Sequence, residues 1–190
     1  MLDVRTLLVV ILVVATLQGV GFLVLHWTQP RVPGLRRSGI AFIIFAIGMA
    51  LTAARGSIDI VYSVLLGNLL VGGGHLLLVD ALCRFFDRPR PRWLDVIFFL
   101  TYLIVFPLCV YLEPENISIR VLISGCVLGA AFLTMVWLLW QARDYPRSLC
   151  WSLIVLTLIH VALLIGRGIG VMLSPGQVEM VANDPLHALL

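Results

Sequence analysis

Long uninterrupted apolar runs, separated by short polar breaks, constrain this chain more than any other feature. The runs lie at about 6–25, 38–54, 60–82, 93–112, 117–140 and 149–173. A transmembrane helix needs about 20 consecutive apolar residues, so each run is long enough to cross a bilayer, with 38–54 at the short limit. The apolar residues do not alternate with period two, which excludes a membrane β-barrel. We predict a single all-α domain over 1–190, a bundle of six transmembrane helices.

Composition excludes a soluble or disordered protein. The chain is 61% hydrophobic and 12% charged, whereas soluble domains average about half apolar and about a quarter charged residues. All 13 basic residues are arginine. They cluster in the breaks between runs rather than on an exposed basic face, so we expect the lipid bilayer as partner and no nucleic acid.

The arginines also predict the orientation. Nine of the 13 follow the first, third and fifth runs, so the positive-inside rule makes that side cytoplasmic and leaves the N-terminus outside. Six spans then also end outside. Residues 183–190 combine Asn183, Asp184 and Pro185 with an apolar sequence, which resembles a helix start. We therefore expect a truncated seventh span at 183–190.

Polar side chains inside the spans are the candidate functional residues, because such groups are costly in a bilayer. Asn68 and His75 are seven residues apart, which places them on one helix face, and His160 and Arg167 have the same spacing. We expect both stripes to face the bundle interior. Small-residue pairs predict close helix contacts within the chain or between subunits: Gly125 with Gly129, and Gly166 with Gly170.

The candidate ligand-binding residues are Asn68, His75, Arg120, His160 and Arg167. Arg120 and Arg167 together suit a carboxylate or phosphate open to the outside. The alternatives are that Arg167 pairs with Asp59 or Glu115, or extends to the headgroups, and that Arg120 marks the interface. His75 and His160 are also a candidate pair of haem ligands, but hydrogen-bonded histidine is the default, and we predict neither cofactor nor metal.

Three further local expectations follow from the sequence. Asp80 and Arg84 are neighbours on one helix face and are expected to pair. Pro107 should kink the helix over 93–112. No catalytic motif is present and no break is long enough for a soluble active site, so no catalytic residue is predicted and the chain itself is not expected to be an enzyme.

Several segments together resemble the N-terminal multi-helix membrane region of bacterial GGDEF-type diguanylate cyclases. They are Arg31-Val32-Pro33-Gly34-Leu35, Leu66-Gly67-Asn68-Leu69-Leu70, Arg84-Phe85-Phe86-Asp87-Arg88-Pro89, and His160 with Arg167. The resemblance implies a signal-sensing domain in the bacterial cytoplasmic (inner) membrane that regulates an attached cytoplasmic cyclase and so the level of cyclic di-GMP. It also implies a homodimer formed through the output domain. This sequence has no GGDEF segment, so any cyclase activity would belong to a longer parent.

Two other function classes remain open from the sequence. A small transporter or channel component would need a water-filled path and often has inverted repeats, and spans one to three show no convincing match to spans four to six. A bis-histidine haem protein for electron transfer is the third reading. For the sensor, the expected signal is a small anionic or lipid-like molecule.

Overall fold

The structure, a computed structural model, describes residues 4–112, 117–142 and 145–173. In these ranges the chain is helical and has no β-strand. The helices, with two π-helical segments named η1 and η2, are α1 (Val4–Thr28), α2 (Leu35–Ala53), η1 (Val61–Leu66), α3 (Gly67–Phe85), α4 (Arg92–Leu100), η2 (Thr101–Val105), α5 (Phe106–Leu112), α6 (Ile117–Gln141) and α7 (Arg147–Leu173).

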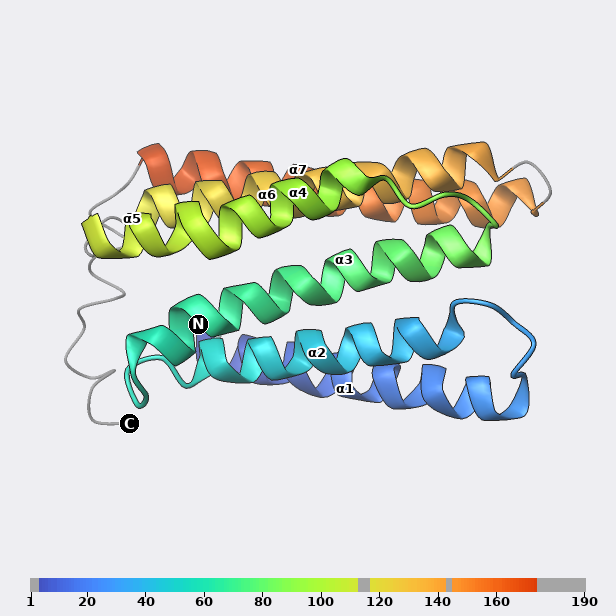
Figure 1. Ribbon diagram of the computed structural model, residues 1–190, viewed down its shortest axis with the longest axis horizontal. Coiled ribbons are helices and arrows are strands. Elements are labelled where there is room, and N and C mark those ends of the chain that lie inside the picture. The colour runs from blue at the N-terminus through green and yellow to red at the C-terminus, as the bar shows by residue number, and fades with distance from the viewer. Residues whose placement is uncertain (1–3, 113–116, 143–144, 174–190) are drawn as a thin grey trace.

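The helices form an antiparallel bundle in which most neighbours in sequence are also neighbours in space (Figure 1). Helix α2 packs between α1 and α3, α3 packs on α6, and α6 packs on α7. The continuous rod of α4, η2 and α5 makes smaller contacts with α3 and α6. The main core lies among α3, α4, α5 and α6, where Val79, Phe98, Phe106 and Leu138 are buried together.

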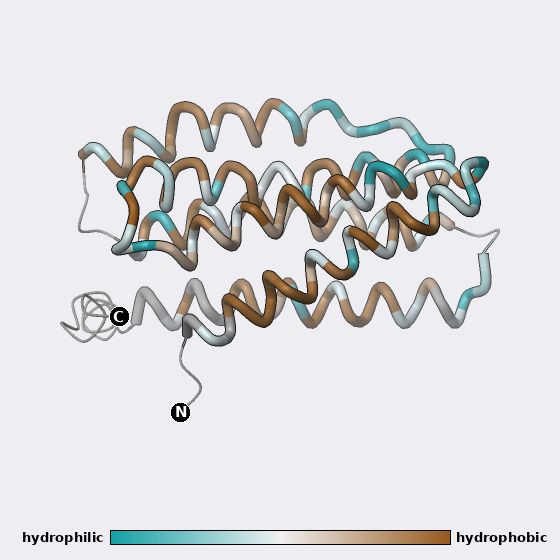
Figure 2. The backbone as a smooth tube through the Cα atoms, turned by 90° about the horizontal axis from the view of Figure 1, so that it is seen from below, coloured by the Kyte–Doolittle hydropathy of each residue, from teal (hydrophilic) through white to brown (hydrophobic). Residues whose placement is uncertain are grey.

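The predicted helices long and apolar enough to cross a membrane are confirmed for most of the chain. Five such helices occur among the described residues: Leu8–Thr28, Leu35–Ala53, Val61–Phe85, Arg92–Leu112 and Ser118–Gln141. Helix α7 adds the apolar stretch Cys150–Gly166. Each predicted apolar run therefore lies mainly in a helix, while the hydrophilic residues gather toward the ends of the bundle (Figure 2). The expected start of a seventh span at 183–190 lies outside the described residues.

Helix α2 begins at Leu35, three residues before the predicted apolar run, and so includes two arginines that the sequence had suggested lie in a loop. Gly34 makes this early start possible, because its φ of 88° is in the left-handed region that favours glycine. A Cβ at Gly34 would also overlap the carbonyl oxygen of Ala81 on α3. Gly34 thus both starts α2 and lets the chain approach α3 closely.

Glycines bring α2 and α3 together at backbone distance. A Cβ at Gly48 would lie 2.8 Å from the Val71 nitrogen and 2.9 Å from the Gly67 oxygen. One at Gly74 would lie 2.9 Å from the Ala41 oxygen. Such contacts permit dispersion and Cα–H···O contacts between helix backbones.

The small-residue pairs Gly125 with Gly129 and Gly166 with Gly170 face no close neighbour among the described residues. A Cβ at any of the four would meet nothing within 4 Å among the described residues. The spacing of small residues does not reveal which helix face a neighbour covers, so it did not separate contacts within the chain from contacts between subunits. Contacts of these glycines between subunits stay a prediction.

Two helices depart from α-helical hydrogen bonding. The π-helical segment η2 ends two residues before Pro107, whose missing N–H disturbs the preceding turn. A π-helical turn thus precedes Pro107, while the predicted kink itself stays a prediction. The second segment, η1, directly precedes Gly67 and Asn68, and the Asp59 carboxylate accepts a 2.7 Å hydrogen bond from the Val61 N–H at its start.

Candidate functional site

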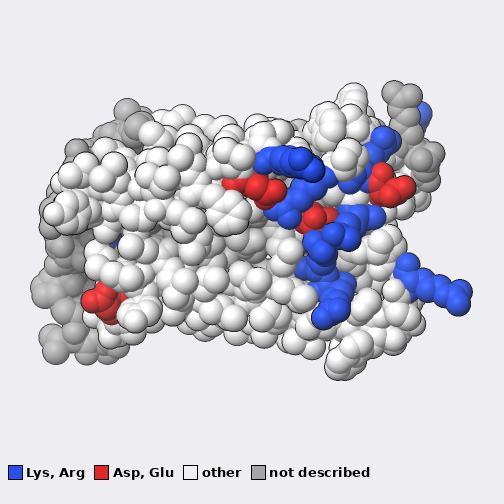
Figure 3. Space-filling view, in the orientation of Figure 1, with Lys and Arg blue, Asp and Glu red and all other residues white. Residues whose placement is uncertain are grey.

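Charged side chains gather at one end of the bundle, which we call the arginine-rich end; it carries the connections 29–34 and 86–91. Figure 3 shows arginines clustered there with acidic side chains among them, while most of the same face is uncharged. All five tryptophans are at least half exposed, as expected for residues that meet the membrane interface: Trp27, Trp93, Trp137, Trp140 and Trp151.

Asp80 is the centre of an ionic network at this end. Its side chain is 8% exposed and pairs with Arg37 of α2, with Arg84 at 3.3 Å and with Arg90 at 3.5 Å. Arg90 also pairs with Asp95 of α4. The five residues form what we call the arginine–aspartate network, and it ties α2, α3 and the start of α4 together. The predicted pair of Asp80 and Arg84 is confirmed.

A row of four rings joins helices across the bundle. The imidazole of His75 lies between Phe45 on α2, at a centroid distance of 5.1 Å, and Phe132 on α6, at 5.0 Å. Phe132 also contacts His160 on α7, at a centroid distance of 4.7 Å. We call Phe45, His75, Phe132 and His160 the aromatic–histidine row. It joins α2, α3, α6 and α7.

Each histidine of the row has a different environment. His75 is half-buried and its Nδ1 lies 2.8 Å from the Val71 carbonyl oxygen one turn back in α3, which satisfies the expected hydrogen bond. His160 is exposed apart from its ring contact with Phe132. The expectation that the His160 stripe faces the interior is therefore wrong at His160, because α7 packs on α6 alone among its larger contacts.

The bis-histidine haem of the third reading stays an untested alternative at this row. Two axial imidazoles must approach one iron from opposite faces of the porphyrin. Here both imidazoles pack against the phenyl ring of Phe132, at centroid distances of 5.0 Å and 4.7 Å. The described residues also contain no cluster of three metal-binding side chains.

The remaining candidate residues are only partly brought together. Asn68 is half-buried and donates a 2.7 Å hydrogen bond from its Nδ2 to the Val64 carbonyl oxygen. Arg120 is 5% exposed and lies inside the bundle on α6. The side chain of Arg167 lies outside the part that the structure describes. A shared anion pocket of Arg120 and Arg167 therefore stays a prediction.

Sequence reasoning missed the two phenylalanines that connect the histidines. Phe45 and Phe132 stand in apolar runs, where an aromatic residue normally only fills the core. Only the packing of α2, α3, α6 and α7 reveals that both rings touch an imidazole. A signal for them would have required knowing which helices are neighbours.

No family model, curated protein or solved structure matches this chain.

Proposed function

We propose that this chain is a signal-sensing membrane domain that regulates an attached cytoplasmic output domain, a GGDEF diguanylate cyclase. In this proposal the protein lies in the bacterial cytoplasmic membrane as six spans, with the N-terminus outside and the arginine-rich end in the cytoplasm. The cyclase reaction belongs to the output domain, which also forms the homodimer. Support comes from the segment resemblance and from the one-sided placement of the arginines.

The observation that carries the proposal is the aromatic–histidine row. Ionisable side chains within membrane helices are expensive and commonly functional. Here the two imidazoles are linked by one phenyl ring, so that α3 and α7 both contact Phe132 of α6. A change at either imidazole would thus alter the packing between the first three helices and the last two.

Regulation requires two helix arrangements with different affinities for the signal. The row supplies a contact between the halves of the bundle, and the arginine–aspartate network holds α2, α3 and α4 as one unit at the end proposed to face the output domain. A signal that favours one packing of α3 against α6 would then shift that unit relative to α6 and α7.

The proposed signal is a small anionic or lipid-like molecule that contacts Asn68, His75, Arg120, His160 and Arg167. Buried Arg120 would provide charge-assisted hydrogen bonds to a carboxylate or phosphate. Loss of the response to every stimulus tested in His160→Ala and Arg167→Ala variants would support this contact set. An intact response in both variants would contradict it.

The test of the regulatory function uses the full gene product, read past Leu190, in cells carrying a cyclic di-GMP reporter. We expect the gene to continue into a GGDEF domain and His75→Leu to change the reporter signal by about fivefold or more, equivalent to roughly 1 kcal/mol in a two-state equilibrium. The control is His26→Leu, in the last turn of α1. A stop codon after Leu190, or equal signals from both variants at equal protein levels, would contradict the proposal.

A further inference from the structure

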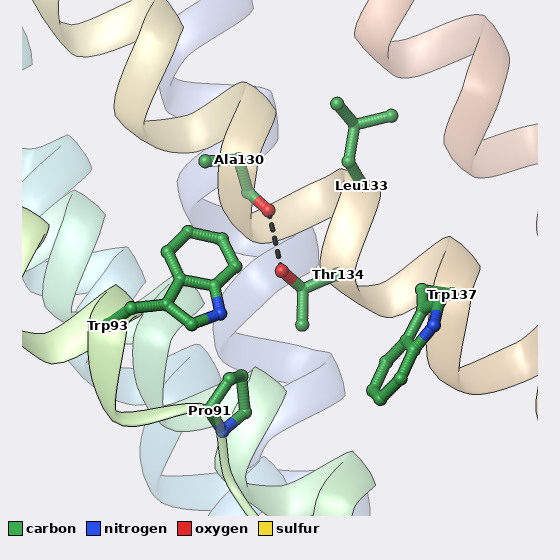
Figure 4. Close-up of a pocket in the computed structure, with 6 residues that line it drawn as sticks. All are labelled: Pro91, Trp93, Ala130, Leu133, Thr134 and Trp137. Carbon is green, nitrogen blue, oxygen red and sulfur yellow. Dashed lines mark hydrogen bonds between the residues drawn. The ribbon is translucent and has the colours of Figure 1, made fainter.

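An open groove runs between α4 and α6 beside the arginine-rich end, and it includes none of the residues of the aromatic–histidine row or the arginine–aspartate network. Its volume is about 420 Å³, within the range of small-molecule sites, about 300–1,000 Å³. Figure 4 shows the indoles of Trp93 and Trp137 on either side of Thr134. Ala130 and Leu133 complete the α6 wall, and Pro91 lies just before the start of α4.

The walls of this groove are apolar, and the connection that leads into α4 at its end carries two exposed arginines. The Thr134 hydroxyl donates a 2.8 Å hydrogen bond to the Ala130 carbonyl oxygen of its own helix, so this hydroxyl offers the groove no free donor. Arg92 stands between the lining residues Pro91 and Trp93, and Arg88 precedes them in the same connection. Both arginines are exposed and neither forms an ion pair with a described residue.

The start of α4 adds to this positive charge. Pro91 is the residue that precedes the helix, so the first N–H groups of α4 and the positive end of its dipole lie at the groove. Asp95 in the first turn would oppose an anion, but its carboxylate is already paired with Arg90.

We propose that this groove binds one anionic phospholipid of the leaflet at the arginine-rich end, with an acyl chain between Trp93 and Trp137 and the phosphate beside Arg92 and Arg88. The charge at the end of the groove selects an anionic over a zwitterionic headgroup, because an exposed arginine near an anionic surface favours binding. The exposed indoles suit the interface, where one face of the ring meets lipid and the N–H remains near polar groups. This inference is independent of the proposed sensing function.

The test is a lipid titration of the purified, delipidated protein by native mass spectrometry. The probes are dioleoyl phosphatidylglycerol and dioleoyl phosphatidylcholine. We expect the first phosphatidylglycerol to bind at least tenfold more tightly than the first phosphatidylcholine. Equal affinity for the two lipids would overturn the proposal.

Two pairs of variants assign the binding to this groove. Arg92→Gln should weaken the first phosphatidylglycerol by about fivefold, the effect of one arginine at an anionic surface, whereas Arg36→Gln, an exposed arginine on α2, should change it less than twofold. Trp137→Ala should weaken both lipids, whereas Trp27→Ala on α1 should weaken neither. Equal effects of the two variants in either pair would show that the lipids bind by diffuse attraction to the whole protein, which would contradict a lipid groove. Competition between inorganic phosphate and phosphatidylglycerol at constant ionic strength would show a simple anion site, which would also contradict it.

Discussion

Asp80 is the residue whose charge matters most for the fold, because three arginines from different parts of the chain surround it. Its side chain is almost buried, while those of Arg37 and Arg84 are 40% and 53% exposed. Water therefore screens part of each interaction, and the network is weaker than a fully buried one. Its main effect is to fix α2 and the start of α4 against the end of α3.

Replacing Asp80 by Asn should destabilise the protein by about 2 kcal/mol, between the values for exposed and buried pairs. The variant loses the acceptor charge and leaves Arg37, Arg84 and Arg90 near one another. The free energy of unfolding in a detergent titration measures the effect. Asp87→Asn is the matched control, because Asp87 is exposed, has no ion pair with a described residue, and has a φ of 52° that Asn tolerates. Equal stabilities of the two variants would contradict the role of the network.

Only part of this network could be predicted from the sequence. Asp80 and Arg84 are four residues apart, so helix geometry alone places them together. Arg37 is 43 residues from Asp80, and their contact depends on how α2 packs against α3. The same limit hid Phe132, because nothing in the sequence around it indicates that α3 and α7 meet α6 at that level.

At the scale of the helices, glycine has two different roles that its spacing does not distinguish. Gly48 faces the backbone of α3, whereas Gly129 faces open space among the described residues. Hydropathy predicted where the helices lie, since long apolar runs have only one stable backbone structure in lipid. It did not predict which face each helix presents to its neighbour, because nearly every face is apolar.

This difference predicts opposite effects of one substitution. Gly48→Ala places a methyl group 2.8 Å from the Val71 nitrogen, so α2 and α3 must separate and the protein should lose about 1–3 kcal/mol of stability. Gly129→Ala meets nothing and should be neutral or stabilising by up to about 1 kcal/mol, the helix-propensity gain. Thermal unfolding in detergent compares the two variants. A loss of stability at Gly129 as large as that at Gly48 would show that a partner covers Gly129.

At the scale of the whole molecule, the bundle has a charged end and an apolar middle, and the proposed orientation puts the charged end in the cytoplasm. Ser57 and Ser148 are both exposed and lie on opposite ends, in the connection after α2 and at the start of α7. They provide a matched pair of positions for testing that orientation.

Single cysteines at these serines should react differently with a membrane-impermeant maleimide, in a background whose four native cysteines are alanine. In intact cells Ser57→Cys should be labelled, whereas Ser148→Cys should be labelled only after permeabilisation, because the arginine-rich end is held inside. The reverse pattern would place the arginine-rich end outside and separate it from a cytoplasmic output domain.

The proposed function requires that contact between α3 and α6 through Phe132 sets the output of the attached domain. The most direct measurement is the cyclic di-GMP level in cells that express the full gene product with Phe132→Ala, against Phe99→Ala. Phe99 is a phenylalanine of α4 that is 53% exposed and lies outside the aromatic–histidine row. We predict that Phe132→Ala shifts the level at least fivefold at equal protein abundance while Phe99→Ala leaves it unchanged. An unchanged level in both variants would contradict the claim.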